Sequence, residues 1–407
     1  MIPRSVGRVL AVLIASSCGA ASSATDSMPN PTLPATSASE PAPSSTSLIP
    51  SVTTTDSPPV PAPTSTPTTS TTTIPDISHD FPAFDRVVEE MVIGAGSRDV
   101  SVAVVRDGEV LHTFTAAKGR AGVDPKTPFR LASISKTVTT VAALMLVEQG
   151  VLTLDTPVVG DVASRAELSL GDPRTASITL RQLLSHTSGF DDHLDYFFSP
   201  TTDEVTTMMS KALGGELFAD PGTAYRYSNI NFQLVGMLME QTTGESYESL
   251  VRRLVFEPLR LTSFRYATDD ANVEGEPWYV VSGGRRYMMM LGPGGAWTAS
   301  AADIARLVDS LRVDDDGWHP LSTPMFEEMF TAQTPSPADP VWDYGLGVRI
   351  FASGAVGHTG TIESVHTLAI TRPDGLSFAV LVNGSYPMET DELLDVLFAA
   401  ELAARGL

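Results

Sequence analysis

The stretch FRLASISKTVTTVAALMLVEQG, residues 129–150, is the most informative part of this sequence. From Ile134 onward the stretch is strongly apolar, and Gly150 is suited to end a helix at its C-terminal cap. A helix that is apolar around most of its circumference packs against protein on most of its sides. The sequence therefore predicts a buried helix here.

Two polar side chains lie at the start of this helix. Ser133 and Lys136 are three residues apart, a spacing that puts both on one face. Burial disfavours the ammonium form of a lysine, so its neutral amine can act as a base. The free N–H groups at a helix N-terminus suit an oxyanion, so the pair fits an activated serine nucleophile. The alternative is that Ser133 caps the helix and Lys136 is exposed, and the Ser-x-x-Lys spacing alone is a weak signal.

Strand patterns occur at both ends of the domain, and helical patterns lie between them. The expected strands are a hairpin at 99–116 with its turn at Asp107-Gly108, a strand at 345–351, a short run into His358, and a pair at 365–372 and 376–384 that turns at Asp374-Gly375. The expected terminal helices are 84–96 and 389–404. The fold class is α+β, with one antiparallel sheet of about five strands built from both ends and a mainly helical insertion at roughly 150–310.

The N-terminus has the features of an export signal. Arg4 and Arg8 form a basic region, and the apolar run at 9–14 is too short to span a bilayer. The run ends at Ala15-Ser-Ser-Cys18, which resembles a bacterial lipobox, so we expect a signal peptide at 1–18 and a lipidated Cys18. The alternative is an ordinary signal peptide cut near residues 21–25. Cys18 is the single cysteine, so no disulfide and no cysteine nucleophile are expected in the folded domain.

Residues 19–80 do not have the composition of a folded domain. Between residues 51 and 75, 20 of 25 residues are Ser, Thr or Pro, which leaves too little apolar surface to offset the entropy of ordering. We expect a tether that leads to a hydrolase domain at 81–407. The exported chain would lie at the outer face of the cytoplasmic membrane as a lipoprotein, or would otherwise be secreted.

The net charge of −22 limits the partners of the chain. A strongly acidic protein is repelled by nucleic acid and by anionic membrane surfaces. We therefore expect no nucleic-acid partner, and membrane contact through a lipid anchor only.

Three further stretches carry candidate site residues. Tyr227 and Asn229 precede an amphipathic helix; a tyrosine hydroxyl near a lysine gives up its proton more readily, and an asparagine amide both donates and accepts hydrogen bonds. The stretch GHTG at 357–360 is expected on an edge strand, where glycines let a ligand backbone approach closely. Taken alone, Tyr227 and Asn229 are more typical of turn residues, and LLSHTSGF at 183–190 of a structural helix end.

In this order, Ser133-x-x-Lys136, Tyr227-x-Asn229 and His358-Thr359-Gly360 resemble the motifs of the serine β-lactamase and D-Ala-D-Ala-peptidase superfamily. The resemblance is to the branch with class C β-lactamases, D-alanyl-D-alanine carboxypeptidases and related esterases. It extends over about 85–400 and includes YGLGV at 344–348 and GGAWTASAADIARL at 294–307.

The resemblance implies a role for each matching residue. Ser133 would be the acylated nucleophile, and Lys136 and Tyr227 would share its proton and pass it to the leaving group. Asn229 would hold the amide of the acyl side chain. The family needs no metal and no cofactor.

The remaining implied roles belong to the stretch around His358. His358, Thr359 and Gly360 would line the leaving-group side of the substrate site. The backbone N–H groups of Ser133 and Thr361 would form the oxyanion hole.

Two other kinds of protein compete with this interpretation. A Ser-His-Asp hydrolase with the G-x-S-x-G elbow is disfavoured because that pattern is absent from the chain. A catalytically weak penicillin-binding or envelope-binding module would be expected to have lost part of the set Ser133, Lys136 and Tyr227, yet all three are present.

Within the family, the substrate is a peptidoglycan stem peptide, a small ester or a β-lactam. Many family β-lactamases carry a lysine at the position of His358, and a neutral imidazole is a weaker carboxylate anchor than an ammonium group. Arg349 is the candidate replacement cation. We therefore expect a D-alanyl-D-alanine carboxypeptidase-like peptidase or an esterase, with β-lactamase activity as the alternative.

Overall fold

The computed structural model describes residues 80–118, 122–192, 197, 204–267, 275–279, 287–312, 319–334, 339, 341–384 and 392–406. The chain divides into two compact units, residues 1–70 and 71–407, and every described residue belongs to the second. The expected signal peptide, the lipidation site Cys18 and the tether up to residue 79 lie outside the described residues.

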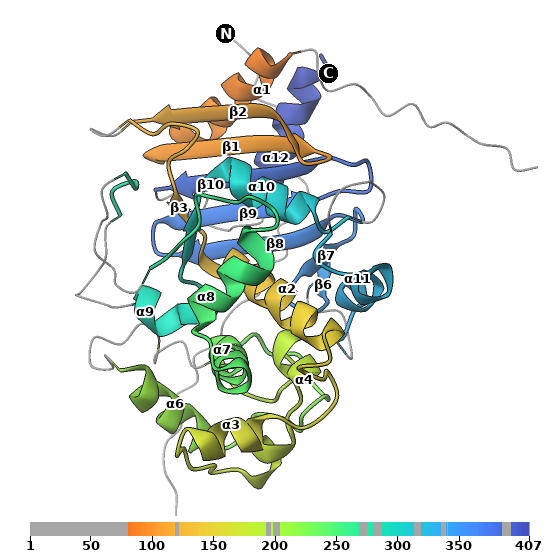
Figure 1. The fold of residues 1–407 in the computed structure, drawn as a ribbon. Helices are drawn as coiled ribbons and strands as arrows, with labels where there is room; N and C mark the ends of the chain where they lie inside the picture. Colours follow the sequence, from red (N-terminus) through yellow and green to blue (C-terminus); the bar gives the residue numbers. More distant parts are fainter. Residues whose placement is uncertain are drawn as a thin grey trace, which may run out of the picture. The chain divides into compact units, whose positions relative to one another are not determined.

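The second unit is built on an antiparallel sheet with the strand order β2-β1-β10-β9-β8-β7-β6 (Figure 1). Its strands are β1 (Asp99–Arg106), β2 (Glu109–Ala117), β6 (Trp342–Tyr344), β7 (Arg349–Phe351), β8 (Val356–Ile362), β9 (Val365–Thr371) and β10 (Ser377–Asn383). Because β10 pairs along its whole length with β1, the two ends of the domain share one sheet. The α+β class with a sheet built from both ends is therefore confirmed.

The two predicted Asp-Gly turns join neighbouring strands of this sheet. Asp107 and Gly108 both have positive φ, 51° and 75°, as the tight turn between β1 and β2 requires. Gly375 has φ 83° between β9 and β10. A short polar side chain or no side chain tolerates this backbone conformation, which is why these pairs are reliable turn signals.

The sheet has seven strands, whereas about five were expected. The expected strand at 345–351 is interrupted, because Gly347 has φ 64° and the Gly345 N–H donates to the Val348 carbonyl at 3.0 Å. This turn separates β6 from β7, which then pair with each other. A Cβ at Gly347 would lie 1.8 Å from Thr140 Oγ1, so this turn packs directly on the helix that contains Thr140.

Helices cover both faces of the large sheet. On one face lie α1 (Phe81–Val88), which continues as a π-helical turn (Glu89–Ile93), and α12 (Glu392–Ala404). On the other face lie α10 (Ala301–Asp309) and the remaining helices (Figure 1). These are α2 (Ser135–Glu148), α3 (Val159–Arg165), α4 (Leu180–Leu184), α6 (Val205–Leu213), α7 (Asn229–Thr243), α8 (Tyr247–Val251), α9 (Tyr287–Leu291) and α11 (Thr323–Phe330).

The predicted central helix is α2, and eleven of its fourteen residues are buried. It follows β3 (Phe129–Arg130) in the sequence. This strand belongs to a small sheet with the order β3-β5-β4, whose other strands are β4 (Arg265–Tyr266) and β5 (Trp297–Ala299). Such a helix can be buried all round only between the sheet and other helices.

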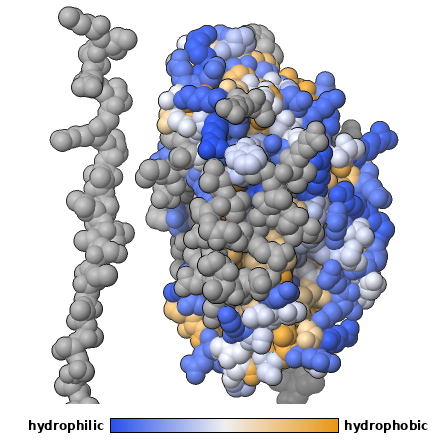
Figure 2. All heavy atoms as spheres, turned by 90° about the vertical axis from the view of Figure 1, so that its left-hand side faces the viewer, coloured by the Kyte–Doolittle hydropathy of each residue, from blue (hydrophilic) through white to orange (hydrophobic). Residues whose placement is uncertain are grey.

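One face of the molecule carries both polar and apolar residues. Figure 2 shows hydrophilic residues interspersed with small apolar patches on the face toward the viewer. Within the part of the chain that the structure describes, no helix combines the length and apolar character that a membrane crossing needs.

Candidate active site

Ser133 lies in a 3-10 turn, Ala132–Ile134, between β3 and α2 rather than in the first turn of the helix itself. Ala132 has φ 50°, a left-handed conformation that a residue with a side chain adopts only when its surroundings enforce it. Trp297 of β5 provides this enforcement on both sides of the turn. Its carbonyl accepts from Leu131 N–H at 2.9 Å, and its own N–H donates to Ser135 Oγ at 3.2 Å.

Lys136 is fully buried directly behind Ser133. Its Nζ lies 3.2 Å from Ser133 Oγ and 2.7 Å from the carbonyl oxygen of Gly294. Burial holds the pKa of Lys136 well below its usual value of 10.5. Burial therefore favours the neutral amine, whose lone pair can accept the proton of the serine hydroxyl.

Tyr227 approaches Ser133 from the segment before α7. Its hydroxyl is hydrogen-bonded to the Ser133 side chain, and its ring centroid lies 4.9 Å from Lys136 Nζ. Burial raises the pKa of Tyr227 to about 12, although the Ser133 hydrogen bond and the charge of Arg349 lower it. The expectation that Tyr227 gives up its proton readily is therefore not met in the resting site, because burial of the hydroxyl disfavours the phenolate.

Asn229 is the first residue of α7 and is buried. Its Oδ1 atom has no hydrogen-bond partner among the described residues. Buried polar atoms in native proteins are almost always paired, so an unpaired amide oxygen two residues after Tyr227 is suited to an incoming N–H group.

His358 lies on β8 and is buried. Its Nδ1 contacts the Thr359 carbonyl, so Nδ1 carries a proton, and its Nε2 lies 2.9 Å from the Tyr344 hydroxyl, which donates to it. Burial, followed by the charges of Arg349 and Lys136, lowers the pKa of His358 well below its usual value. His358 is therefore a neutral imidazole with both nitrogens engaged.

The stretch around Gly360 packs closely on the nucleophile turn. A Cβ at Gly360 would lie 2.4 Å from the Leu131 carbonyl oxygen and 2.5 Å from Thr367 Oγ1. Thr359 is buried and Thr361 is exposed. The backbone of β8 is therefore in direct contact with the turn that carries Ser133.

The direction of the Thr361 N–H follows from the strand register. Phe351 N–H donates to the Ala355 carbonyl at 2.9 Å, and Arg349 pairs with Gly357, so Gly357 directs its backbone groups toward β7. Backbone direction repeats every two residues, so Thr361 faces the same edge. The expectation of an edge strand is wrong, because β8 lies between β9 and β7; its pairing with β7 covers Val356 and Gly357. The Thr361 N–H thus points away from β9 and is not used in the pairing with β7.

Sequence reasoning did not assign a site role to His186, which lies next to Tyr227. The two ring centroids are 4.2 Å apart, and His186 Nδ1 accepts from Ser228 N–H and lies near Asn231 Nδ2, both at 3.1 Å. His186 has a left-handed backbone conformation, with φ 58°. The glycine stop in LLSHTSGF was readable from sequence, but the contact with Tyr227 was not, because it joins distant parts of the chain.

Arg349 is a cation beside this cluster. It lies half-buried on β7, with its guanidinium 4.2 Å above the ring centroid of Trp342. Burial is the largest cause of the lowered pKa of His358, and the charge of Arg349 is the second. The same charge lowers the pKa of Tyr227, against the larger rise caused by burial. It is thus close enough to act electrostatically on the groups around Ser133.

Among the described residues, neither buried histidine of the cluster has a carboxylate as a hydrogen-bond partner. His358 contacts Thr359 and Tyr344, and His186 contacts Ser228 and Asn231. A Ser-His-Asp arrangement is therefore not what surrounds Ser133. Within the described ranges, no group of His, Cys, Asp and Glu side chains is arranged to hold a metal ion.

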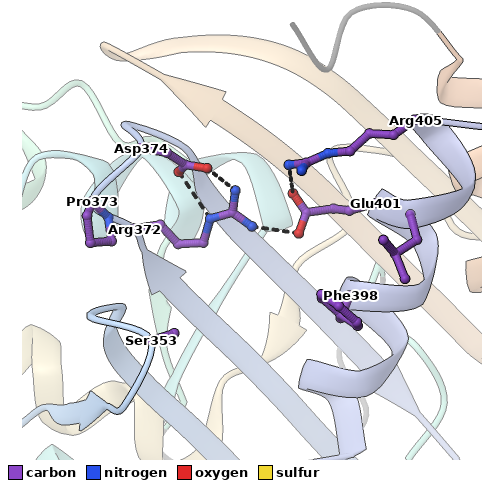
Figure 3. A pocket seen from close by; sticks show the side chains of 8 residues that line it. Ser353, Arg372, Pro373, Asp374, Phe398, Glu401 and Arg405 are labelled. Atoms are coloured by element: carbon purple, nitrogen blue, oxygen red, sulfur yellow. Dashed lines mark hydrogen bonds and ion pairs between the residues drawn. The ribbon is translucent and has the colours of Figure 1, made fainter. Parts of the chain in front are cut away.

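A separate hollow of about 440 Å³ lies between α12 and the end of β9 (Figure 3). Its polar groups pair with one another, since Arg372 contacts Asp374 and Glu401 (Figure 3). It lies on the α12 face of the sheet, whereas the side chains around Ser133 belong to the other face. This hollow is therefore not part of the candidate active site.

The fold and the cluster of Ser133, Lys136 and Tyr227 define a serine hydrolase. The Beta-lactamase family model matches residues 84–401, and the chain belongs to this family.

Curated relatives are found in several bacteria. The chain is 27% identical over 251 residues to a probable fimbrial assembly protein FimD, serogroup H1, of Dichelobacter nodosus, an alignment covering 58% of this chain and 62% of that protein. It is 28% identical over 181 residues to penicillin-binding protein 4* of Bacillus subtilis (strain 168), covering 40% of this chain and 37% of that protein. The chain thus spans less than two thirds of the length of these curated relatives.

Solved structures share the fold. A D-stereospecific amidohydrolase from Streptomyces sp. superposes with a TM-score of 0.65 at 26% identity, covering 78% of this chain and 98% of that one. The D-amino acid amidase of Ochrobactrum anthropi SV3 superposes with a TM-score of 0.65 at 21% identity, covering 80% and 99%. The second likeness shows the fold alone.

Proposed function

We propose that this chain forms an acyl-enzyme on Ser133 with a D-alanyl-D-alanine-type peptide or a small ester. The observation that carries the proposal is the state of His358, which is neutral and has both ring nitrogens engaged. The position at which many β-lactamases of the family carry a lysine therefore supplies no cation here. The site therefore lacks the lysine anchor for the substrate carboxylate that those β-lactamases use at this position.

Two further features support a D-amino-acid peptide. The unpaired Asn229 Oδ1 can accept the amide N–H of an acyl side chain. Arg349 supplies a permanent positive charge beside His358, suited to the terminal carboxylate of a leaving D-amino acid. The Streptomyces amidohydrolase, described as D-stereospecific, is consistent with this substrate class.

The proposed acylation begins with the neutral Lys136 amine. Lys136 accepts the proton of Ser133 as Oγ attacks the substrate carbonyl carbon, and the bond from Oγ to that carbon forms. The carbonyl oxygen becomes an oxyanion that accepts from the backbone N–H groups of Ser133 and Thr361. Fixed N–H donors stabilise this charge without rearrangement.

The second half of acylation needs an acid for the leaving group. Tyr227 keeps its proton in the resting site, so it can donate that proton to the leaving nitrogen or oxygen as the scissile bond breaks. Lys136 then returns the serine proton to Tyr227. A water molecule then attacks the acyl-enzyme carbonyl carbon, the bond from that carbon to Ser133 Oγ breaks, and the acid product is released.

The test is covalent labelling by a fluorophosphonate and by a labelled penicillin, located by mass spectrometry. The wild type should be labelled on Ser133, and Ser133→Ala should lose the label. Ser249→Ala, which removes an exposed serine on α8, is the matched control and should label normally. Equal labelling of Ser133→Ala would rule out this nucleophile.

The lifetime of the penicilloyl adduct separates the candidate activities. In a peptidase or esterase, the penicilloyl adduct should persist much longer than one turnover of the enzyme's own substrate. A β-lactamase must instead hydrolyse the adduct quickly. Rapid and specific hydrolysis of cephalosporins by the purified domain would replace the present proposal with β-lactamase activity.

Arg349→Gln tests the carboxylate anchor. For a peptide ending in D-alanyl-D-alanine, the variant should raise KM by about tenfold or more, because an ion pair and its hydrogen bonds are lost. For the same peptide with a C-terminal amide, KM should change little. Equal effects on both peptides would show that Arg349 does not bind the carboxylate.

We also propose that the catalytic domain is held at the outer face of the cytoplasmic membrane through a lipid on Cys18. The sequence around Cys18 and the tether composition support this. Palmitate labelling of cells expressing the full chain should mark the wild type and not Cys18→Ala. Unlabelled wild-type protein in the medium would instead indicate simple secretion.

A further inference from the structure

A chain of hydrogen bonds runs through three buried side chains behind Lys136. Trp297 Nε1 lies 2.8 Å from the Tyr247 hydroxyl oxygen, which lies 2.6 Å from Thr139 Oγ1. Thr139 Oγ1 in turn lies 2.6 Å from the carbonyl oxygen of Pro293. All three side chains are buried.

The groups at the two ends of this hydrogen-bond series fix which atom donates and which accepts at each step. An indole N–H only donates and a carbonyl oxygen only accepts. Tyr247 therefore accepts from Trp297 and donates to Thr139, and Thr139 donates to Pro293. A second carbonyl, that of Ser135, lies at 3.1 Å from Thr139 Oγ1, but the single hydroxyl proton has its shorter contact with Pro293. Hydrogen bonds aligned in one direction strengthen one another.

This series of hydrogen bonds ends at the Pro293 carbonyl, one residue before the carbonyl that contacts Lys136. Pro293 and Gly294 belong to the same 3-10 turn, Gly292–Gly294, and the Gly294 oxygen lies 2.7 Å from Lys136 Nζ. The turn has little freedom, because a Cβ at Gly236 of α7 would lie 2.4 Å from the Pro293 ring. Fixing the Pro293 peptide, together with the hydrogen bonds from Gly295 N–H and Ala296 N–H to the Gly292 carbonyl at 3.0 and 2.8 Å, therefore restricts the orientation of the Gly294 carbonyl.

We propose that Trp297, Tyr247 and Thr139 are positioning residues for Lys136. They hold the Gly294 carbonyl where it takes one N–H of the amine, so that the amine lone pair faces Ser133. This inference rests on the proposed role of Lys136 as the base that accepts the serine proton.

The geometry explains why a fixed carbonyl matters. A neutral amine has two N–H donors and one lone pair, and it rotates freely unless a donor is held. The Gly294 oxygen holds one donor, and Ser133 Oγ lies 3.2 Å from the same nitrogen. If the carbonyl moved, the amine could rotate and present an N–H to the serine in place of the lone pair.

The same contact also affects the protonation of Lys136. A carbonyl stabilises the ammonium form more than the neutral amine, so its loss should lower the pKa of the lysine further. The titratable and charged groups that surround Lys136 or act on this site are Tyr227, His186, His358 and Arg349. None of these is altered by a substitution at Thr139.

The experiment measures the second-order rate of fluorophosphonate labelling of Ser133 as a function of pH. In Thr139→Val, the labelling rate on the pH-independent plateau should fall about tenfold, the size of effect expected when a general base is misplaced. The acid limb, the pH range in which the rate falls with decreasing pH, should move to lower pH. Thr139→Ser, which keeps the hydroxyl, should restore the plateau to within about twofold. Thr137→Val is the matched control, because it removes another buried hydroxyl of α2 that donates to Gly347 at 2.9 Å, and it should not move the acid limb.

Tyr247→Phe interrupts the chain one step earlier and serves if Thr139→Val does not fold. It should move the acid limb in the same direction. A Thr139→Val or Tyr247→Phe enzyme whose plateau and acid limb match those of Thr137→Val would overturn the positioning role. Failure of the wild type to label at Ser133 would instead overturn the proposed function, so the two failures are distinguishable.

Discussion

At the residue scale, the charge state of Lys136 governs the site. Its amine is buried, contacts two oxygens and has a pKa held well below 10.5 by burial. The unfolded chain holds a proton on this lysine up to its usual pKa of 10.5, whereas the folded protein releases it at a lower pH. Between the folded pKa and 10.5 the unfolded state binds more protons, and stability therefore rises with pH in that window.

Lys136→Met should therefore separate activity from stability. The acylation rate should fall by at least about 100-fold, because the general base is lost. The free energy of unfolding at pH 7 should rise by about 1–3 kcal/mol, because methionine fills the space without a buried amine. Fluorophosphonate labelling and urea unfolding measure the two effects. The exposed Lys211→Met on α6 is the control and should change neither quantity, and near-normal acylation by Lys136→Met would show that Tyr227 works without the lysine.

Tyr227→Phe should show a dependence on the leaving group. Burial raises the pKa of Tyr227 to about 12, so the resting hydroxyl is an acid rather than a base. Acylation by an amide should fall about 100-fold or more, whereas acylation by a nitrophenyl ester, whose leaving group needs no proton, should fall about tenfold or less. Rates for both substrates come from burst kinetics. Equal losses would show that Tyr227 does not protonate the leaving group.

At the element scale, β8 is held against the turn that contains Ser133. A Cβ at Gly360 would lie 2.4 Å from the Leu131 carbonyl oxygen. Strand and turn can approach this closely only because position 360 has no side chain. The separation between the Thr361 N–H and Ser133 thus depends on how two elements pack.

Gly360→Ala should push β8 away from this turn. Acylation should fall by about 100-fold, the scale of losing one oxyanion donor, and stability by about 1–3 kcal/mol from overpacking. Gly122→Ala is the control, because a Cβ there would meet nothing within 4 Å. Labelling kinetics together with thermal unfolding check both effects, and a Gly360→Ala enzyme with wild-type labelling kinetics would argue against an oxyanion role for β8.

At the scale of the whole molecule, buried neutral histidines set the pH dependence of stability. Burial is the main cause of the lowered pKa of His186, His358 and His366. Below pH 6.5 the unfolded chain protonates these side chains while the native state does not. Stability is therefore retained above 6.5 and lost as pH falls toward the folded pKa values.

The midpoint of urea unfolding should decrease between pH 7 and pH 5.5. Each fully shifted histidine contributes a slope approaching about 1.4 kcal/mol per pH unit. Asp99 and Asp309, whose pKa burial raises, act in the opposite sense, so a variant is needed to isolate the histidines. His358→Gln should reduce the slope of the unfolding free energy against pH by up to about 1.4 kcal/mol per pH unit, the contribution of one proton. A slope unchanged in this variant would show that His358 has the same pKa in the folded and unfolded states.

Local residue patterns were enough to predict most elements and the identity of the central cluster. The Asp-Gly turns, the apolar run of α2 and the glycine that ends it depend on neighbours a few residues away. The Ser133 and Lys136 pair is likewise one helical turn apart. Such features could be inferred because the interactions that define them are local.

Features that depend on distant contacts could not be inferred. The turn at Gly347 that separates β6 from β7 is set by its packing on Thr140. The neutral state of His358 and the raised pKa of Tyr227 follow from burial, and burial depends on the complete fold.

The sequence by itself thus determined the α+β class, the order of the site motifs and the pairing of Ser133 with Lys136. Only the tertiary structure decided which carbonyl orients that lysine, since Lys136 and Gly294 are 158 positions apart. It also decided the protonation of the tyrosine and histidine beside them. The physical reason is that a residue pattern encodes contacts within a turn or strand, whereas desolvation and hydrogen bonds across the core exist only once distant segments have packed together.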